Sequence, residues 1–170
     1  HYKNTPHPLS FSREGNVYWI NFSNSLQKKK DQAITVYFEG KPTESIHPPW
    51  SGGITWDKDN NDIDFIASAN QGSGASIWWP NKDHSYDEPD NGAIISVTVP
   101  EHLTNVSNGR LKNTTHHKKE KKKTFHWEVI NPINNYGINI NIGDYVNFSE
   151  KYEGEKGILD CEYWVLKSNL

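Results

Sequence analysis

The sequence predicts an all-β protein in which short antiparallel strands form a sandwich or curved sheets with little helix. Eight segments alternate apolar and polar residues with a period of two and are rich in β-branched and aromatic residues. Short runs of Gly, Pro, Asn and Asp separate these segments, and such runs are typical of turns. No window carries the apolar stripe of an amphipathic helix.

The predicted strands are distributed along the whole chain. In order, they are Val17–Phe22, Ala33–Glu39, Ile63–Ala67, Ala75–Trp79, Ala93–Val99, Thr124–Ile130, Ile138–Ile142 and Gly157–Val165. The turn-forming runs between them are Glu39–Pro42, Pro48–Gly53, Asp90–Gly92, Ser107–Gly109 and Glu153–Gly157. Successive side chains of a strand point to opposite faces, so the apolar face of each strand needs a second layer to cover it. This requirement favours a sandwich or a curved sheet.

Composition indicates one domain over residues 1–170. With 34% hydrophobic residues, a chain of 170 residues can bury about 70% of its unfolded surface. The net charge of −3 gives no electrostatic reason to expect a nucleic-acid partner. No apolar run approaches the roughly 20 residues of a membrane span. The single cysteine, Cys161, excludes an internal disulfide and is expected to be a buried thiol in a strand.

Two motifs that could hold a cation or an anion have simpler interpretations. Asp57–Asp62 resembles the start of a calcium loop, but Asp62 and Ser68 stand where Gly and Glu are required, so a polar hairpin turn is favoured. The charge run His116–Lys123 is expected to form a solvated hairpin tip rather than a binding site for an anionic partner. None of the eight histidines stands in a His-Glu-x-x-His arrangement. The chain is therefore expected to have no metal site.

The acidic residues of the central segment are the candidates for catalysis. Asp83, Asp87, Glu88 and Asp90 could supply paired carboxylates for glycoside chemistry. A turn around Pro89 is favoured, because Asp and Pro suit turn geometry without any catalytic role. The Gly72–Gly74 sequence lacks the context of a serine nucleophile elbow. No catalytic residue is therefore assigned.

The segment Gln71–Pro89 is the most informative of the sequence. It places Trp78 and Trp79 between a glycine-rich loop and an acidic turn, which indicates the lining of an open binding site. One alternative is a carbohydrate-binding module in which Trp78 and Trp79, or Trp50 and Trp56, stack on sugar rings. Consecutive strand residues face opposite sides, which weighs against a platform made by Trp78 and Trp79.

The same region resembles the N-terminal domain of zinc aminopeptidases related to aminopeptidase N and leukotriene hydrolase. The resemblance rests on Gln-Gly at Gln71, Trp-Trp-Pro ending at Pro80, Lys-Asp-His, Asp-Glu-Pro, Ser-Val-Thr-Val-Pro ending at Pro100, and Val106–Arg110. It extends to Pro48–Gly53, Asn131–Tyr136 and Phe148–Gly154. Ser76 and Asn81 depart from the family, which often has Arg and Cys at these positions.

The resemblance implies a saddle-like β domain that packs on a catalytic domain of the same polypeptide. The family's Gly-x-Met-Glu-Asn and His-Glu-x-x-His motifs belong to that catalytic domain, and neither occurs here. The resemblance thus implies no cofactor in this chain and zinc in the parent enzyme. Because the chain begins at His1 and contains no Met, we expect it to be an N-terminally trimmed piece of a longer polypeptide.

One site residue follows from the resemblance. Relatives use Gln or Glu at the position of Gln71 to accept a hydrogen bond from the α-ammonium of the peptide substrate. The predicted partners are therefore this peptide N-terminus and the catalytic domain. The resemblance is strongest to the secreted or periplasmic bacterial branch, which favours an extracytoplasmic location.

Overall fold

The structure is a computed structural model that describes residues 8–22, 28–84 and 86–170. Its regular elements are antiparallel strands and three single-turn 3-10 helices. The predicted all-β class is therefore confirmed. None of the helices in the described residues is long and apolar enough to cross a membrane. The chain divides into two units, residues 1–37 and residues 38–170, and each is described by itself.

The described residues of the first unit, 8–22 and 28–37, contain one β-hairpin. Strands β1 (Ser10–Glu14) and β2 (Val17–Asn21) pair antiparallel. Gly15 forms the tight turn with φ of 59°, a conformation that glycine adopts without strain. Strand β2 confirms the predicted strand at Val17–Phe22.

The predicted strand Ala33–Glu39 is wrong. The residues from 28 to 43 carry no strand, although the alternating pattern is present in the sequence. A strand exists only where a neighbour completes its hydrogen-bond ladder, and no described segment pairs with this one.

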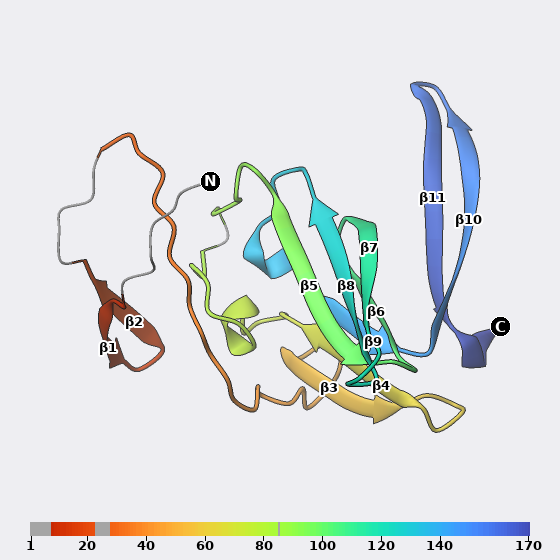
Figure 1. The fold of residues 1–170 in the computed structure, drawn as a ribbon, viewed down its shortest axis with the longest axis horizontal. Helices are drawn as coiled ribbons and strands as arrows, with labels where there is room; N and C mark the ends of the chain where they lie inside the picture. The colour runs from red at the N-terminus through yellow and green to blue at the C-terminus, as the bar shows by residue number, and fades with distance from the viewer. Residues whose placement is uncertain (1–7, 23–27, 85) are drawn as a thin grey trace. The chain divides into compact units, whose positions relative to one another are not determined.

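The second unit contains two sheets and a long hairpin (Figure 1). The four-stranded sheet has the order β3-β4-β9-β6, and the three-stranded sheet has the order β5-β8-β7. Their strands are β3 (Gly53–Lys58), β4 (Asp64–Ala69), β5 (Ala93–Pro100), β6 (Thr104–Ser107), β7 (Arg110–His117), β8 (Lys122–Val129) and β9 (Ile140–Gly143). All the ladders within these sheets are antiparallel.

The hydrophobic core draws side chains from both sheets. Its buried members are Val99 on β5, Phe125 and Trp127 on β8, Ile142 on β9, and Leu103, which precedes β6. The partly buried hydrophobic side chains that pack against this group are Ile63, Ile66, Ile95, Val97, Val106, Leu111 and Trp164. Two sheets that share one apolar core form a sandwich-like arrangement, as the sequence predicts.

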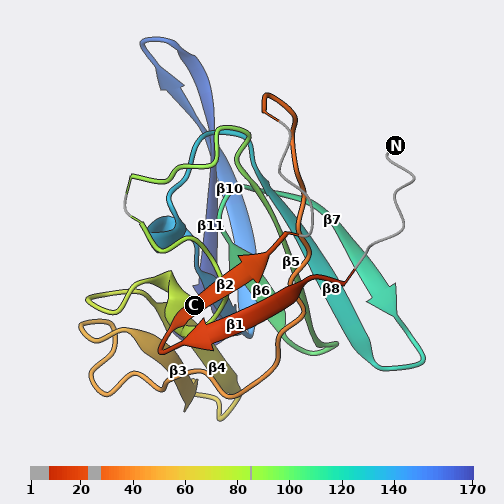
Figure 2. The same ribbon diagram turned by 90° about the vertical axis from the view of Figure 1, so that its left-hand side faces the viewer.

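The hairpin of β10 (Tyr145–Gly154) and β11 (Gly157–Leu166) follows the sheets (Figures 1 and 2). Near its base, Trp164 packs edge-on against Trp127 with ring centroids 5.7 Å apart. Farther along, the Tyr163 hydroxyl donates to Glu150 at 2.6 Å, and this bond raises the pKa of Tyr163 to about 12. Cys161 lies on β11 but is only partly buried, so the prediction of a buried thiol is wrong.

Both charged turns have the predicted structure. Asp59 closes the β3–β4 turn by accepting backbone N–H bonds from Asn61 and Ile63, at 2.8 and 3.0 Å. The charge run His116–Lys123 lies at the tip of the β7–β8 hairpin.

Candidate functional site

The candidate site begins where β4 ends. The Asn70 carbonyl accepts the Gly74 N–H at 2.9 Å, which closes a loop through Gln71. Gly72 and Gly74 have φ of 72° and 75°, in the left-handed region that favours glycine. The chain then enters a 3-10 helix, Ala75–Ile77. The predicted strand at Ala75–Trp79 is therefore wrong, because the two glycines turn the backbone out of the extended conformation.

Asn70 ties this loop to a distant segment. Its side chain is buried and donates to the carbonyls of Tyr136 and Ile138, at 2.8 and 3.0 Å. Its amide oxygen accepts the indole N–H of Trp78 at 3.1 Å. Both N–H donors of the Asn70 amide and one lone pair of its oxygen thus hold the end of β4, the Trp78 ring and the 136–138 backbone together.

Gln71, the predicted site residue, lies on the exposed side of the same turn. The hydroxyl of Tyr136 donates a hydrogen bond to its Oε1. Tyr136 belongs to a 3-10 helix, Asn135–Gly137, whose first turn is capped by the side chain of Asn134 at 2.9 Å from the Gly137 nitrogen. An exposed amide at the end of β4 is therefore fixed by a residue 65 positions away in the sequence.

The Pro48–Gly53 segment lies in close contact with the main chain of Gln71. A Cβ atom added to Gly52 would lie 2.8 Å from the Gln71 carbonyl oxygen and 2.9 Å from Ser73 Cβ. Only glycine allows this approach of the Pro48–Gly53 segment to the loop. The Pro48–Gly53 segment is part of the family resemblance, and its close approach to the loop explains why position 52 is a glycine.

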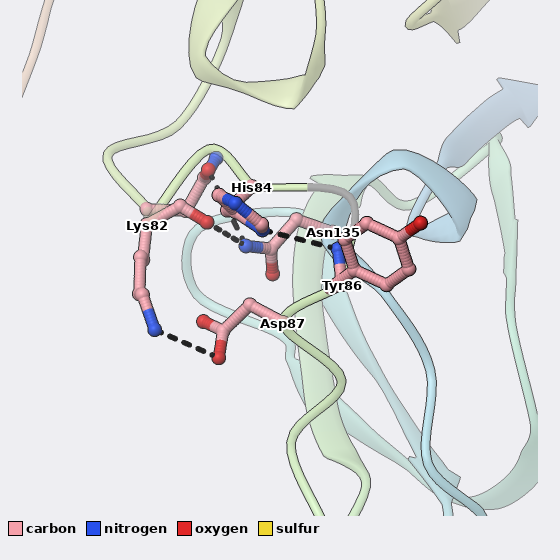
Figure 3. A network of polar contacts seen from close by, with 6 residues as sticks. Lys82, His84, Tyr86, Asp87 and Asn135 are labelled. Atoms are coloured by element: carbon pink, nitrogen blue, oxygen red, sulfur yellow. Dashed lines mark hydrogen bonds and ion pairs between the residues drawn. The ribbon is translucent and has the colours of Figure 1, made fainter.

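The loop after Pro80 is fixed by Asn135, as Figure 3 shows. The buried side chain of Asn135 donates to the Lys82 carbonyl at 2.6 Å. The Lys82 ammonium in turn forms an ion pair with Asp87 at 3.1 Å. In the same loop the Tyr86 N–H donates to the Nδ1 atom of His84 at 3.2 Å. Thus two buried asparagines, Asn70 and Asn135, connect both sides of the candidate site to one short helix.

Two of the four acidic candidates, Asp83 and Asp87, have structural partners instead of one another. Asp83 accepts the Ser76 hydroxyl at 2.6 Å, and its carboxylate lies directly against Gly74. Asp87 contacts Lys82. The interpretation of a turn is favoured over paired catalytic carboxylates, since each of these two acids is engaged separately.

The two adjacent tryptophans do not form a flat platform. The rings of Trp78 and Trp79 are half-buried, with centroids 5.8 Å apart and planes inclined by 50°. Trp50 and Trp56 are exposed, at 81% and 54% of their surface. Sugar stacking needs exposed ring faces. Trp78 does not suit this role, because its ring is half-buried and its indole N–H donates to Asn70.

The described part of the chain does not fit a zinc ion. Within residues 8–22, 28–84 and 86–170, no three His, Cys, Asp or Glu side chains converge as metal ligands. Zinc requires three or four such ligands at about 2.0–2.3 Å. No chemical step through a metal is therefore assigned to these residues.

Comparisons of the fold identify similar solved structures. An M1 zinc metallopeptidase from Deinococcus radiodurans matches with a TM-score of 0.67 and 13% identity over 94% of this chain. A two-domain M1 zinc metallopeptidase mutant bound to L-tryptophan matches with a TM-score of 0.68, 15% identity and the same coverage. A mutant of the Deinococcus enzyme bound to a Tyr-Ser-Ala substrate matches with a TM-score of 0.58 and 16% identity over 75% of this chain.

These matches confirm the predicted resemblance in fold to zinc metallopeptidases of the aminopeptidase type. This chain spans only 28–35% of the length of those structures. No family model matches the sequence. No curated protein matches it either.

Proposed function

We propose that this chain is a non-catalytic β domain of a zinc-dependent aminopeptidase. In this role it packs on the catalytic domain of the same polypeptide and presents Gln71 to the N-terminus of the peptide substrate. The observation that carries the proposal is the likeness of 94% of the chain to about a third of a two-domain M1 zinc metallopeptidase. The peptide-bond chemistry and the zinc ligands would then belong to the rest of the enzyme.

The geometry of Gln71 suits recognition of an α-ammonium group. Its carboxamide is exposed, and Oε1 has two lone pairs, of which the Tyr136 hydroxyl uses one. The second lone pair is available to an N–H donor of a ligand. A neutral amide oxygen accepts such a bond without adding a charge that would itself need desolvation.

Replacing Gln71 with alanine in the intact enzyme is expected to raise KM for peptides with a free N-terminus about tenfold. The reason is the loss of one hydrogen bond to a charged group, which contributes about 1.5–3 kcal/mol at most when fully formed. Steady-state kinetics measure this, with Gln32→Ala as a control that removes the same group at another exposed position. An unchanged KM would remove Gln71 from the substrate site.

A further inference from the structure

We infer that Tyr136 is a positioning residue that orients the carboxamide of Gln71 toward the α-ammonium of a peptide or amino acid. This inference rests on the proposed function, because it concerns the same contact. It adds a second residue, and it specifies which atom of the amide faces the ligand.

The first support is the rigidity of the Tyr136 backbone. Its carbonyl is bound by the buried side chain of Asn70 at 2.8 Å, and the adjoining turn is capped by Asn134. Asn70 is also the residue directly before Gln71. The hydroxyl donor and the amide acceptor are therefore anchored to one another through the same asparagine.

The second support is the chemistry of the amide. A glutamine side chain can present either its oxygen or its NH2 group, and an NH2 group directed at an ammonium places donor against donor. A phenol is a better donor than acceptor, because the ring withdraws density from its oxygen. Donation from Tyr136 to Oε1 therefore favours the rotamer in which the oxygen, and not the nitrogen, is fixed at the site.

The third support is the exposure of both side chains. Tyr136 is 50% exposed, and Gln71 is also exposed, so the hydrogen bond between them is not required to satisfy buried groups. A free glutamine side chain has up to about 2 kcal/mol of rotamer entropy to lose on binding. An orienting bond reduces this loss before the ligand arrives, which lowers the cost of recognition.

The test is a double-mutant cycle in the intact enzyme with Tyr136→Phe, Gln71→Ala and both changes. Tyr136→Phe removes only the hydroxyl and is expected to raise KM for free peptides, and the inhibition constant of L-arginine, about two- to tenfold, with little change in kcat. Binding of N-acetyl-arginine, which has no α-ammonium, is expected to stay unchanged. Tyr152→Phe is the matched control, a 62% exposed tyrosine whose hydroxyl donates to no described residue.

Four outcomes separate the inference from the function on which it rests. If Tyr136→Phe raises KM and the double variant is no weaker than Gln71→Ala, the inference holds. If only Gln71→Ala raises KM, the inference is overturned and the proposed function stands. If the two effects add, Tyr136 acts independently of Gln71 and the inference is again overturned. If neither change affects KM, both proposals fail.

Discussion

Replacing Trp127 with alanine is expected to lower the free energy of unfolding of this chain by about 3–5 kcal/mol. Trp127 is 2% exposed on the central strand of the three-stranded sheet, and it packs against Trp164 of the β10–β11 hairpin. Its indole N–H also donates to the Oδ1 atom of Asn105 at 3.0 Å. The change thus opens a cavity and leaves a fully buried amide oxygen without this donor.

Urea unfolding of the 170-residue chain measures this loss as a lower transition midpoint. Trp50→Ala is the matched control, because Trp50 is 81% exposed and its removal is expected to change stability by no more than about 0.5 kcal/mol. Equal midpoints for the Trp127 and Trp50 variants would show that Trp127 is not the centre of the core.

Replacing Asn70 with alanine is expected to lower the free energy of unfolding by about 2–3 kcal/mol, the cost of leaving buried polar groups without partners. Asn70 is 6% exposed, and its loss frees the Trp78 indole N–H together with the carbonyls of Tyr136 and Ile138. The loop that carries Gln71 would also lose its link to the 136–138 segment.

The same urea experiment measures this effect. Asn61→Ala is its control, because Asn61 is exposed in the β3–β4 turn. If the Asn70 and Asn61 variants had equal stability, the buried amide network would not be the support of the candidate site.

The sequence predicts the class of the fold because a strand with one buried and one exposed face has alternating apolar and polar residues. The prediction succeeds at β5 and β8, whose Val99, Phe125 and Trp127 occupy the core. It misses β1, β3, β6, β7 and β10, and among these β7 and β10 are rich in polar residues and have no fully buried ones. Such strands are stabilised by backbone hydrogen bonds to a neighbouring strand. The residue pattern of one segment does not show which strand will pair with it.

The candidate site is predicted only in part. Gln71 follows from a resemblance, and the structure places it on the exposed side of a turn with its amide engaged. Asn70, Asn135 and Tyr136 have no periodic signal, since a buried asparagine is recognised by its hydrogen bonds and not by its position in an alternating pattern. Their roles depend on contacts between residues 53 to 66 positions apart in the sequence, which only the fold brings together.

The most direct test of the proposed function is a crystal structure of the longer enzyme with a bound free amino acid. The proposal predicts that the amino nitrogen lies about 2.7–3.2 Å from Oε1 of Gln71, with the Tyr136 hydroxyl on the other lone pair of the same oxygen. An amino acid bound where Gln71 makes no contact with its amino group, or a zinc ion held by residues 38–170, would contradict it.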